Sequence, residues 1–123
     1  MDKGVYIAIF YLPTTQQITV GKLGRFGFQK GFYFYAGSAQ RNLTRRFERH
    51  NKKVKPLHWH IDYVSARAKM IGAITVVGGR DCECKLAKGL KILFKPELPG
   101  FGASDCRCGS HLFYAPTIAS FTL

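Results

Sequence analysis

Residues 33–50 read YFYAGSAQRNLTRRFERH, and the hydrophobic period changes within this stretch. The aromatic residues before Gly37 are typical of a β-strand, and the pair Gly37–Ser38 predicts a turn. Beyond that turn, Leu43 and Phe47 stand four residues apart, which is the spacing of one helix face. The stretch therefore predicts a strand, a turn and a helix that carries a cluster of arginines.

Two segments before this stretch also predict strands. They are GVYIAIFYL (4–12) and ITVGKLGRFGF (18–28), both rich in β-branched and aromatic residues. GFYFYAG (31–37) follows them, and glycines mark turns or bulges along the way. Because the three predicted strands are consecutive, we expect an antiparallel meander.

The remainder of the chain mixes helices and strands. Residues 57–68 predict a short helix after a proline, and 82–94 predict a helix with leucines on one face. Residues 70–79 predict a central strand, 111–115 a last short strand, and 95–110 a loop. Strands with segregated helices predict an α+β fold, namely a small antiparallel β-sheet with a three-stranded core and short extra strands, flanked by helices.

The charge of the chain points to a polyanionic partner. The 123 residues fit a single domain, 1–123, without repeats or a charged tail. Lysine and arginine number 19 against 7 acidic residues, which gives a formal net charge of +12. An excess of this size in a small domain favours nucleic acid as the partner first and an acidic membrane surface second. A solvated basic surface without such a partner is the alternative.

Neither a membrane span nor a targeting segment is predicted. No stretch approaches the ~20 consecutive apolar residues that a membrane-spanning helix needs. The N-terminal MDKGVYIAIF contains one lysine and no small-residue cleavage site, so it does not read as a signal peptide. We therefore expect a cytoplasmic protein, or a nucleoid protein if DNA is its partner.

The cysteines leave three possibilities open. They form two CxC pairs, Cys82 with Cys84 and Cys106 with Cys108. A reducing cytosol disfavours disulfides, and the CxC spacing is tight for a zinc ribbon. Reduced thiols are therefore expected, with disulfides and a zinc site as the alternatives.

Five residues have the chemistry of a phosphodiester-cleaving site. Tyr6 and Tyr35 lie on neighbouring predicted strands and can reach a common point. Arg46 and His50 are four residues apart and share a helix face. Glu83 stands near the start of a later helix, where one carboxylate could hold a Mg²⁺ that keeps most of its waters.

These residues occur in an order that resembles the GIY-YIG nuclease superfamily. The matching elements are GVY at 4–6, YAG at 35–37, the Arg–His pair of RFERH at 46–50, and Glu83. The resemblance covers nearly the whole chain and looks closest to a compact, stand-alone Uri-like subgroup. The stretches that carry this closer likeness are VGKLGRF, LHWHIDY, the E-C-x-L-A run and GFGASDCRCGSHLFY.

The resemblance implies a GIY-YIG-like domain that hydrolyses DNA with one divalent cation, Mg²⁺ or Mn²⁺. By that likeness Tyr6 or Tyr35 orients or deprotonates the attacking water, and His50 assists. Arg46 meets the non-bridging oxygens, and Glu83 is the metal ligand. One extra residue after YAG leaves a choice between two arginines, and the spacing to His50 favours Arg46 over its neighbour.

Other residues of the same region are expected to contact DNA phosphates. They belong to the predicted turn and to the basic helix: Gly37, Ser38, Arg41, Arg45, Arg49, Lys52 and Lys53. A non-catalytic nucleic-acid-binding module on the same scaffold is the alternative function, and a cysteine-held zinc domain is a third.

Two further clusters carry polar side chains without a clear place in this chemistry. His58, Trp59, His60 and Asp62 predict a structural hydrogen-bonding network or a wall beside the substrate, with a metal site as the alternative. Asp105 and His111 fall in or beside a glycine-rich loop that could border a DNA groove.

Overall fold

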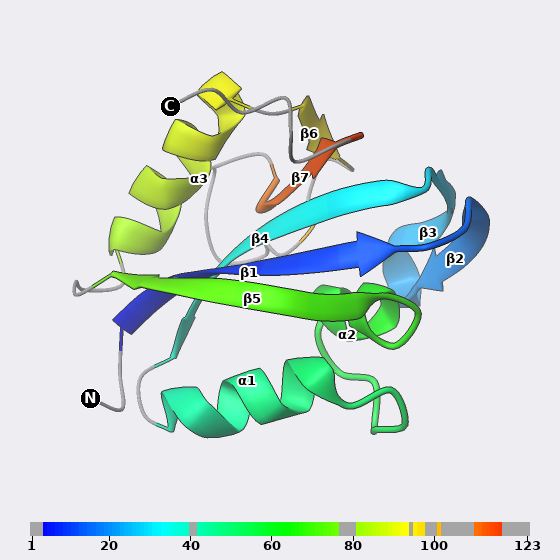
Figure 1. Cartoon of the computed structure of the whole chain (residues 1–123), viewed down its shortest axis with the longest axis horizontal. Helices are drawn as coiled ribbons and strands as arrows, with labels where there is room; N and C mark the ends of the chain where they lie inside the picture. The colour runs from blue at the N-terminus through cyan, green and yellow to red at the C-terminus, as the bar shows by residue number, and fades with distance from the viewer. Residues whose placement is uncertain are drawn as a thin grey trace.

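A computed structural model describes residues 4–39, 42–76, 81–93, 95–97, 101 and 110–116. Its architecture is α+β, with an antiparallel sheet flanked by helices (Figure 1), so the predicted fold class is confirmed. The strands are β1 (Gly4–Leu12), β2 (Gln16–Val20), β3 (Gly24–Phe28), β4 (Gly31–Ala39), β5 (Lys69–Val76), β6 (Lys95–Glu97) and β7 (Leu112–Ala115). The helices are α1 (Leu43–Asn51), α2 (His60–Ser65) and α3 (Asp81–Leu93), with a 3-10 turn at Gly21–Leu23.

The predicted meander is wrong in its pairing. The main sheet has the order β5-β1-β4-β7-β6, and β2 and β3 form a separate two-stranded hairpin. Tyr6 on β1 therefore lies opposite Gly37 on β4, and not opposite β2. The physical reason lies in burial, because β1 and β4 are covered along both faces whereas β2 buries only alternate residues.

Two other expectations for the sheet also need correction. The run after Lys69 forms β5 at one edge of the sheet, and not a central strand. Its Ile71 and Ile74 are 44% and 54% exposed, so the β-branched pattern indicated a strand without indicating its position. The segment 95–110, expected to be loop throughout, contains the short strand β6, because β7 offers it a backbone ladder.

The core lies on both faces of the sheet and follows the period of two along β1. Tyr6, Ala8 and Phe10 pack into the cluster beneath α1 and α2, together with the β2–β3 hairpin. Ile7 and Ile9 pack on the opposite face with residues of α3. Figure 1 shows the same layers, with α1 and α2 on one side of the sheet and α3 on the other. The face beneath α1 carries the candidate site.

The turn predicted at Gly37–Ser38 is absent, because β4 continues through both residues to Ala39. The ladder holds this extension on the β1 side, where Ser38 lies opposite Val5. Helix α1 begins only after Asn42, which takes the left-handed conformation with φ of 56° that asparagine tolerates. The aromatic strand thus delivers its last residues directly beneath the basic helix.

Candidate functional site

A buried hydrogen bond joins the first strand to the basic helix. The Tyr6 hydroxyl and His50 Nε2 are 2.8 Å apart, and the two residues are 0% and 1% exposed. Either partner can be the donor, depending on which ring nitrogen of His50 carries the proton. Among the described residues, His50 Nδ1 has no hydrogen-bond partner. The bond fixes the C-terminal turn of α1 against β1.

Aromatic rings surround this pair. The Tyr35 ring lies 6.4 Å from Tyr6 and 6.0 Å from His50 between centroids, and it is the more exposed of the two tyrosines. Phe47 meets Tyr6 edge-on at 5.2 Å, and Phe10 meets His50 edge-on at 5.9 Å. The structure therefore brings Tyr6, Tyr35 and His50 together in an apolar surrounding.

His50 is held in its neutral form. Burial, and then the positive charges of Lys55 and Arg46, lower its pKa from 6.5 to about 3. Asp62 acts in the opposite direction but does not compensate. At neutral pH the imidazole is therefore a hydrogen-bond partner of Tyr6 and not a reservoir of protons.

Arg46 lies across the surface of Trp59. Its Cζ is 4.2 Å from the centre of the indole, and its Nη1 donates to the Ser38 carbonyl at 2.9 Å. A guanidinium over an indole gains roughly 0.5–2 kcal/mol from the ring quadrupole. These two contacts leave further donors of Arg46 available to an anion, since no ion pair of Arg46 occurs among the described residues.

Asp62 organises the segment that follows α1. Its fully buried carboxylate accepts from Arg49 Nη2 at 2.6 Å and Nε at 3.2 Å, and from the backbone N–H groups of His58 and Trp59. Burial raises the pKa of Asp62, but these four hydrogen bonds outweigh it and hold the pKa below its usual value. The predicted hydrogen-bonding network is therefore present, with the backbone N–H groups of His58 and Trp59 donating to Asp62. The spacing of the residues did not indicate that Asp62 is the centre of this network.

Gly37 makes room for the two tyrosines. A Cβ at this position would lie 2.6 Å from the Tyr6 hydroxyl oxygen and 2.8 Å from Cε2 of Tyr35. Such distances are shorter than any van der Waals contact, so both rings would have to move. The glycine of YAG is needed here for side-chain space, and not for the turn that the sequence indicated.

We expect Gly37→Ala to lower the free energy of unfolding by about 1–3 kcal/mol, the usual cost of overpacking. Gly72→Ala is the matched control, because a Cβ on this β5 glycine would meet nothing within 4 Å. Urea unfolding followed by circular dichroism compares the two variants. Equal stability of both would show that the rings of Tyr6 and Tyr35 can shift without cost.

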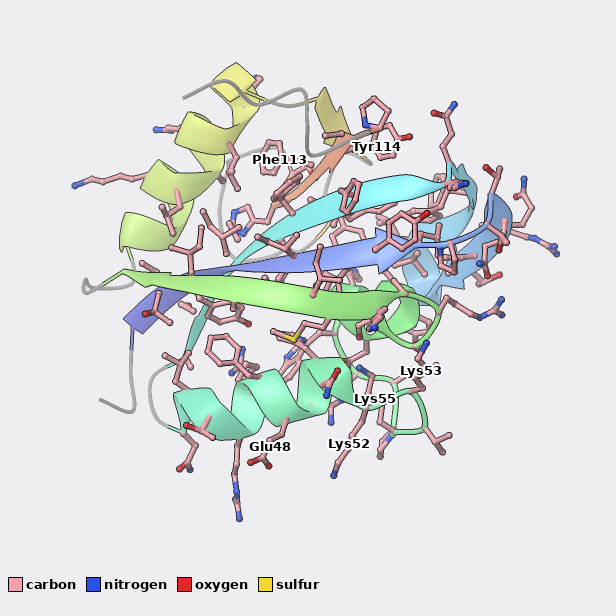
Figure 2. All side chains as sticks on the ribbon, in the orientation of Figure 1. Glu48, Lys52, Lys53, Lys55, Phe113 and Tyr114 are labelled. Atoms are coloured by element: carbon pink, nitrogen blue, oxygen red, sulfur yellow. The ribbon has the colours of Figure 1, made fainter. Side chains whose placement is uncertain are left out.

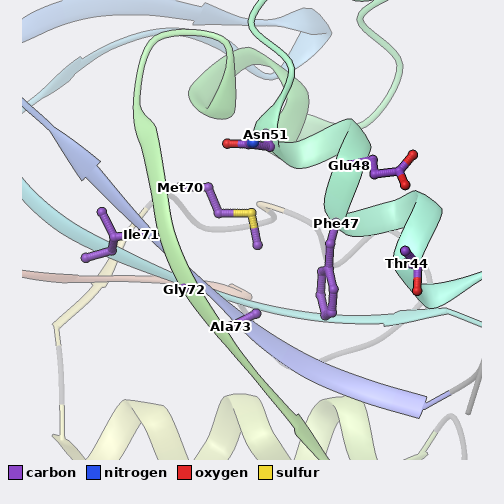
Figure 3. Close-up of a pocket in the computed structure, with 8 residues that line it drawn as sticks. All are labelled: Thr44, Phe47, Glu48, Asn51, Met70, Ile71, Gly72 and Ala73. Carbon is purple, nitrogen blue, oxygen red and sulfur yellow. The ribbon is translucent and has the colours of Figure 1, made fainter.

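Two hollows flank α1, and Glu48 lines both. The first lies between α1 and β5 and has a volume of about 410 Å³. Figure 3 shows Phe47 and Met70 pointing into it, while Ile71 points away. Glu48 is the sole titratable group in its lining, so this hollow offers little chemistry of its own. The second hollow, at the end of α1, is basic.

The other predicted site residues are placed as follows. Arg45, Lys52 and Lys53 are exposed on or just after α1, and Ser38 is half-buried. Arg41, Asp105 and the side chain of Glu83 lie outside the described residues, whereas His111 is buried. Within the described part of the chain, no three His, Cys, Asp or Glu side chains gather as a metal site.

Cys84 on α3 takes part in a disulfide bond, so the expectation of reduced thiols is wrong for this residue. The side chains of the other three cysteines lie outside the described residues. A CxC spacing does not decide between these states, because the bond depends on which sulfurs the tertiary fold brings together.

Fold and site together define a small basic α+β domain with a buried tyrosine–histidine pair. The chain belongs to the family described as a domain of unknown function, DUF123, whose model matches residues 5–122. This match corrects the expected membership of the GIY-YIG nuclease superfamily, for which no family match was found. The motifs GVY and YAG are only three residues each, and matches this short also occur by chance.

Comparison with curated proteins and with solved structures gave no match. Among the helices that the structure describes, none is both long and apolar enough to cross a bilayer.

Proposed function

We propose that the chain is a metal-dependent endonuclease that hydrolyses DNA phosphodiester bonds. The observation that carries the proposal is the Tyr6–His50 hydrogen bond, which fixes a phenol beside Tyr35 on the face that Arg46 covers. The net charge of +12 supports a polyanionic substrate.

The residues of the candidate site have distinct roles in the proposed hydrolysis. Tyr35 faces the attacking water, because it is the more exposed tyrosine, and Tyr6 and His50 position it. Arg46 donates to the non-bridging oxygens, where the transition state gathers negative charge. Ser38 and Trp59 hold the guanidinium in place for that contact.

The proposed binding of a divalent cation depends on one residue, Glu83. Glu83 near the start of α3 is the residue that would hold Mg²⁺ or Mn²⁺, and a bound ion would supply Lewis-acid stabilisation of negative charge on the phosphate. Asp62 is unsuited to this role, because Arg49 and two backbone N–H groups already occupy its oxygens. An ion held by a single carboxylate keeps most of its waters, as Mg²⁺ commonly does.

Cleavage of labelled single- and double-stranded DNA, with Mg²⁺, with Mn²⁺ and with chelator, tests the proposal. We expect Arg46→Ala and Glu83→Gln each to lower the rate about 10²–10³-fold, as the loss of one transition-state contact does. Arg25→Ala, an exposed arginine of β3, is the control and should cleave like the unmodified chain. Undiminished cleavage by both site variants would reject the site.

A non-catalytic nucleic-acid-binding module is the second candidate. The burial of Tyr6 and His50, at 0% and 1% exposure, favours it, because groups shut away from water do not activate a water themselves. Salt-sensitive binding of DNA without cleavage of any substrate would support this candidate over the nuclease.

A further inference from the structure

The basic hollow at the end of α1 is a candidate binding site in its own right. It has a volume of about 470 Å³ and is formed by α1 and the segment that follows. Its lining consists of Arg45, Glu48, Arg49, Lys52, Val54, Lys55 and Pro56. Figure 2 shows Lys52, Lys53 and Lys55 gathered where α1 ends.

The charges of this lining are poorly compensated. Four cations face one carboxylate, Glu48, and within the described part of the chain the single ion pair is Arg49 with Asp62. Arg45 and Lys52 are exposed, and their side chains make no ion pair among those residues. A concave surface with this excess of positive charge concentrates anions.

Hydrogen bonds to neighbouring residues hold two of the four cationic side chains in place. Arg49 donates to Asp62 and to the Pro56 carbonyl at 2.6 Å, and its guanidinium lies 4.8 Å from the Trp59 ring. Lys55 Nζ donates to the Arg49 carbonyl at 2.8 Å and to the Ser65 hydroxyl. An ammonium has three donors, so one N–H of Lys55 remains for a ligand. The site is therefore partly preorganised.

The surroundings of Lys55 also lower its pKa. Burial lowers its pKa to about 8, although the nearby Asp62 raises it and Arg49 lowers it further. A bound anion would offset the burial and favour the charged ammonium. Binding of an anion should therefore depend on pH above neutrality.

We propose that this hollow binds a backbone phosphate of the nucleic acid, on the strand whose neighbouring phosphate meets Arg46. Cations from the helix and from Lys55 meet the phosphate oxygens, and Val54 and Pro56 form an apolar rim for the adjoining sugar. Arg45 and Arg49 are four residues apart on α1, and Lys52 follows directly at its C-cap, so the end of α1 offers a row of contacts along the strand. This inference rests on the proposed action on nucleic acid and adds Lys55 as a recognition residue.

Binding of a fluorescent single-stranded oligonucleotide in chelator tests the inference without cleavage. We expect Lys52→Gln and Lys55→Gln each to reduce the slope of log affinity against log salt, by up to about 0.7, the share of one phosphate. Lys88→Gln is the control, because this exposed lysine lies on α3, across the sheet. Far-UV circular dichroism checks that the variants are folded.

The pH dependence gives a second readout. The affinity of the unmodified chain should fall between pH 7 and pH 9 as Lys55 loses its proton, and Lys55→Arg should remove this fall. The charged groups around Lys55 are Glu48, Asp62, Arg45, Arg49 and Lys52, and all five are common to both chains.

The outcomes separate the two proposals. Oligonucleotide binding with unchanged salt slopes in both pocket variants would overturn the phosphate site and leave the nuclease proposal standing. Absence of any oligonucleotide binding would overturn both. Binding of inorganic phosphate alone at this hollow, with oligonucleotide affinity unaffected by Lys55→Gln, would identify free phosphate as the ligand and also overturn the inference.

Discussion

Asp62→Ala is expected to lower the free energy of unfolding by about 3–5 kcal/mol, as the loss of one partner from a buried ion pair does. The carboxylate is fully buried and accepts four hydrogen bonds. Alanine would leave the Arg49 guanidinium unpaired and would also strip two backbone N–H groups of their acceptor. Helix α2 would lose its N-terminal anchor at the same time, because Trp59 N–H donates to this carboxylate at 2.8 Å.

Urea unfolding measures this loss, with two variants for comparison. Asp62→Asn keeps an oxygen for the backbone N–H groups but not the negative charge, so we expect an intermediate loss. Glu48→Ala removes an exposed carboxylate that makes no ion pair with the described residues, and it should change stability by less than about 0.5 kcal/mol. A similar small effect for Asp62→Ala would contradict the anchoring role.

Acid should destabilise this protein through His50. Its pKa is about 3 in the folded chain and near 6.5 when unfolded, so between these values only the unfolded chain takes up the proton. The free energy of unfolding is therefore expected to fall by about 1.4 kcal/mol for each pH unit lost in this window. Well above pH 6.5 the imidazole is neutral in both states and contributes no slope.

The change of unfolding free energy with pH, measured for two histidine variants, tests this role of His50. His50→Gln should flatten the dependence between pH 6 and pH 4, whereas His58→Gln, at an exposed histidine, should keep it. Asp62, whose pKa is lowered in the folded chain, adds its own loss of stability below about pH 5, and this loss is common to both variants. A direct check is the NMR titration of the His50 ring, and a midpoint near 6.5 would contradict the burial of a neutral imidazole.

Local pattern was sufficient for most elements of the fold. The strand predicted at 4–12 matches β1 residue for residue, since a continuous run of β-branched and aromatic residues is typical of a strand with two buried faces. The helix that begins near Leu43 was equally clear from its period. The helix predicted at 57–68 is shorter, His60–Ser65, because Asp62 caps the backbone before it.

The members of the candidate site were also visible as single residues. Tyr6, Tyr35, Arg46 and His50 were chosen from strand and helix positions, and the structure brings their side chains into one region. The neutral state of His50 could not be predicted, because it depends on burial and on cations from α1 and from the segment that follows it. The support of Arg46 by Trp59 was likewise missed, since the two residues are brought together only by the packing of the segment before α2 against α1.

The α+β class, the positions of most strands and helices, and the strongly basic surface could all be predicted from local pattern and composition. These follow from local hydrophobic period and from composition, which act over a few residues or over the whole chain. The tertiary structure alone decided that β1 pairs with β4, that β5 lies at an edge, and that Gly37 makes space for Tyr6. Such features arise from contacts between residues tens of positions apart, which packing selects and which no local pattern records.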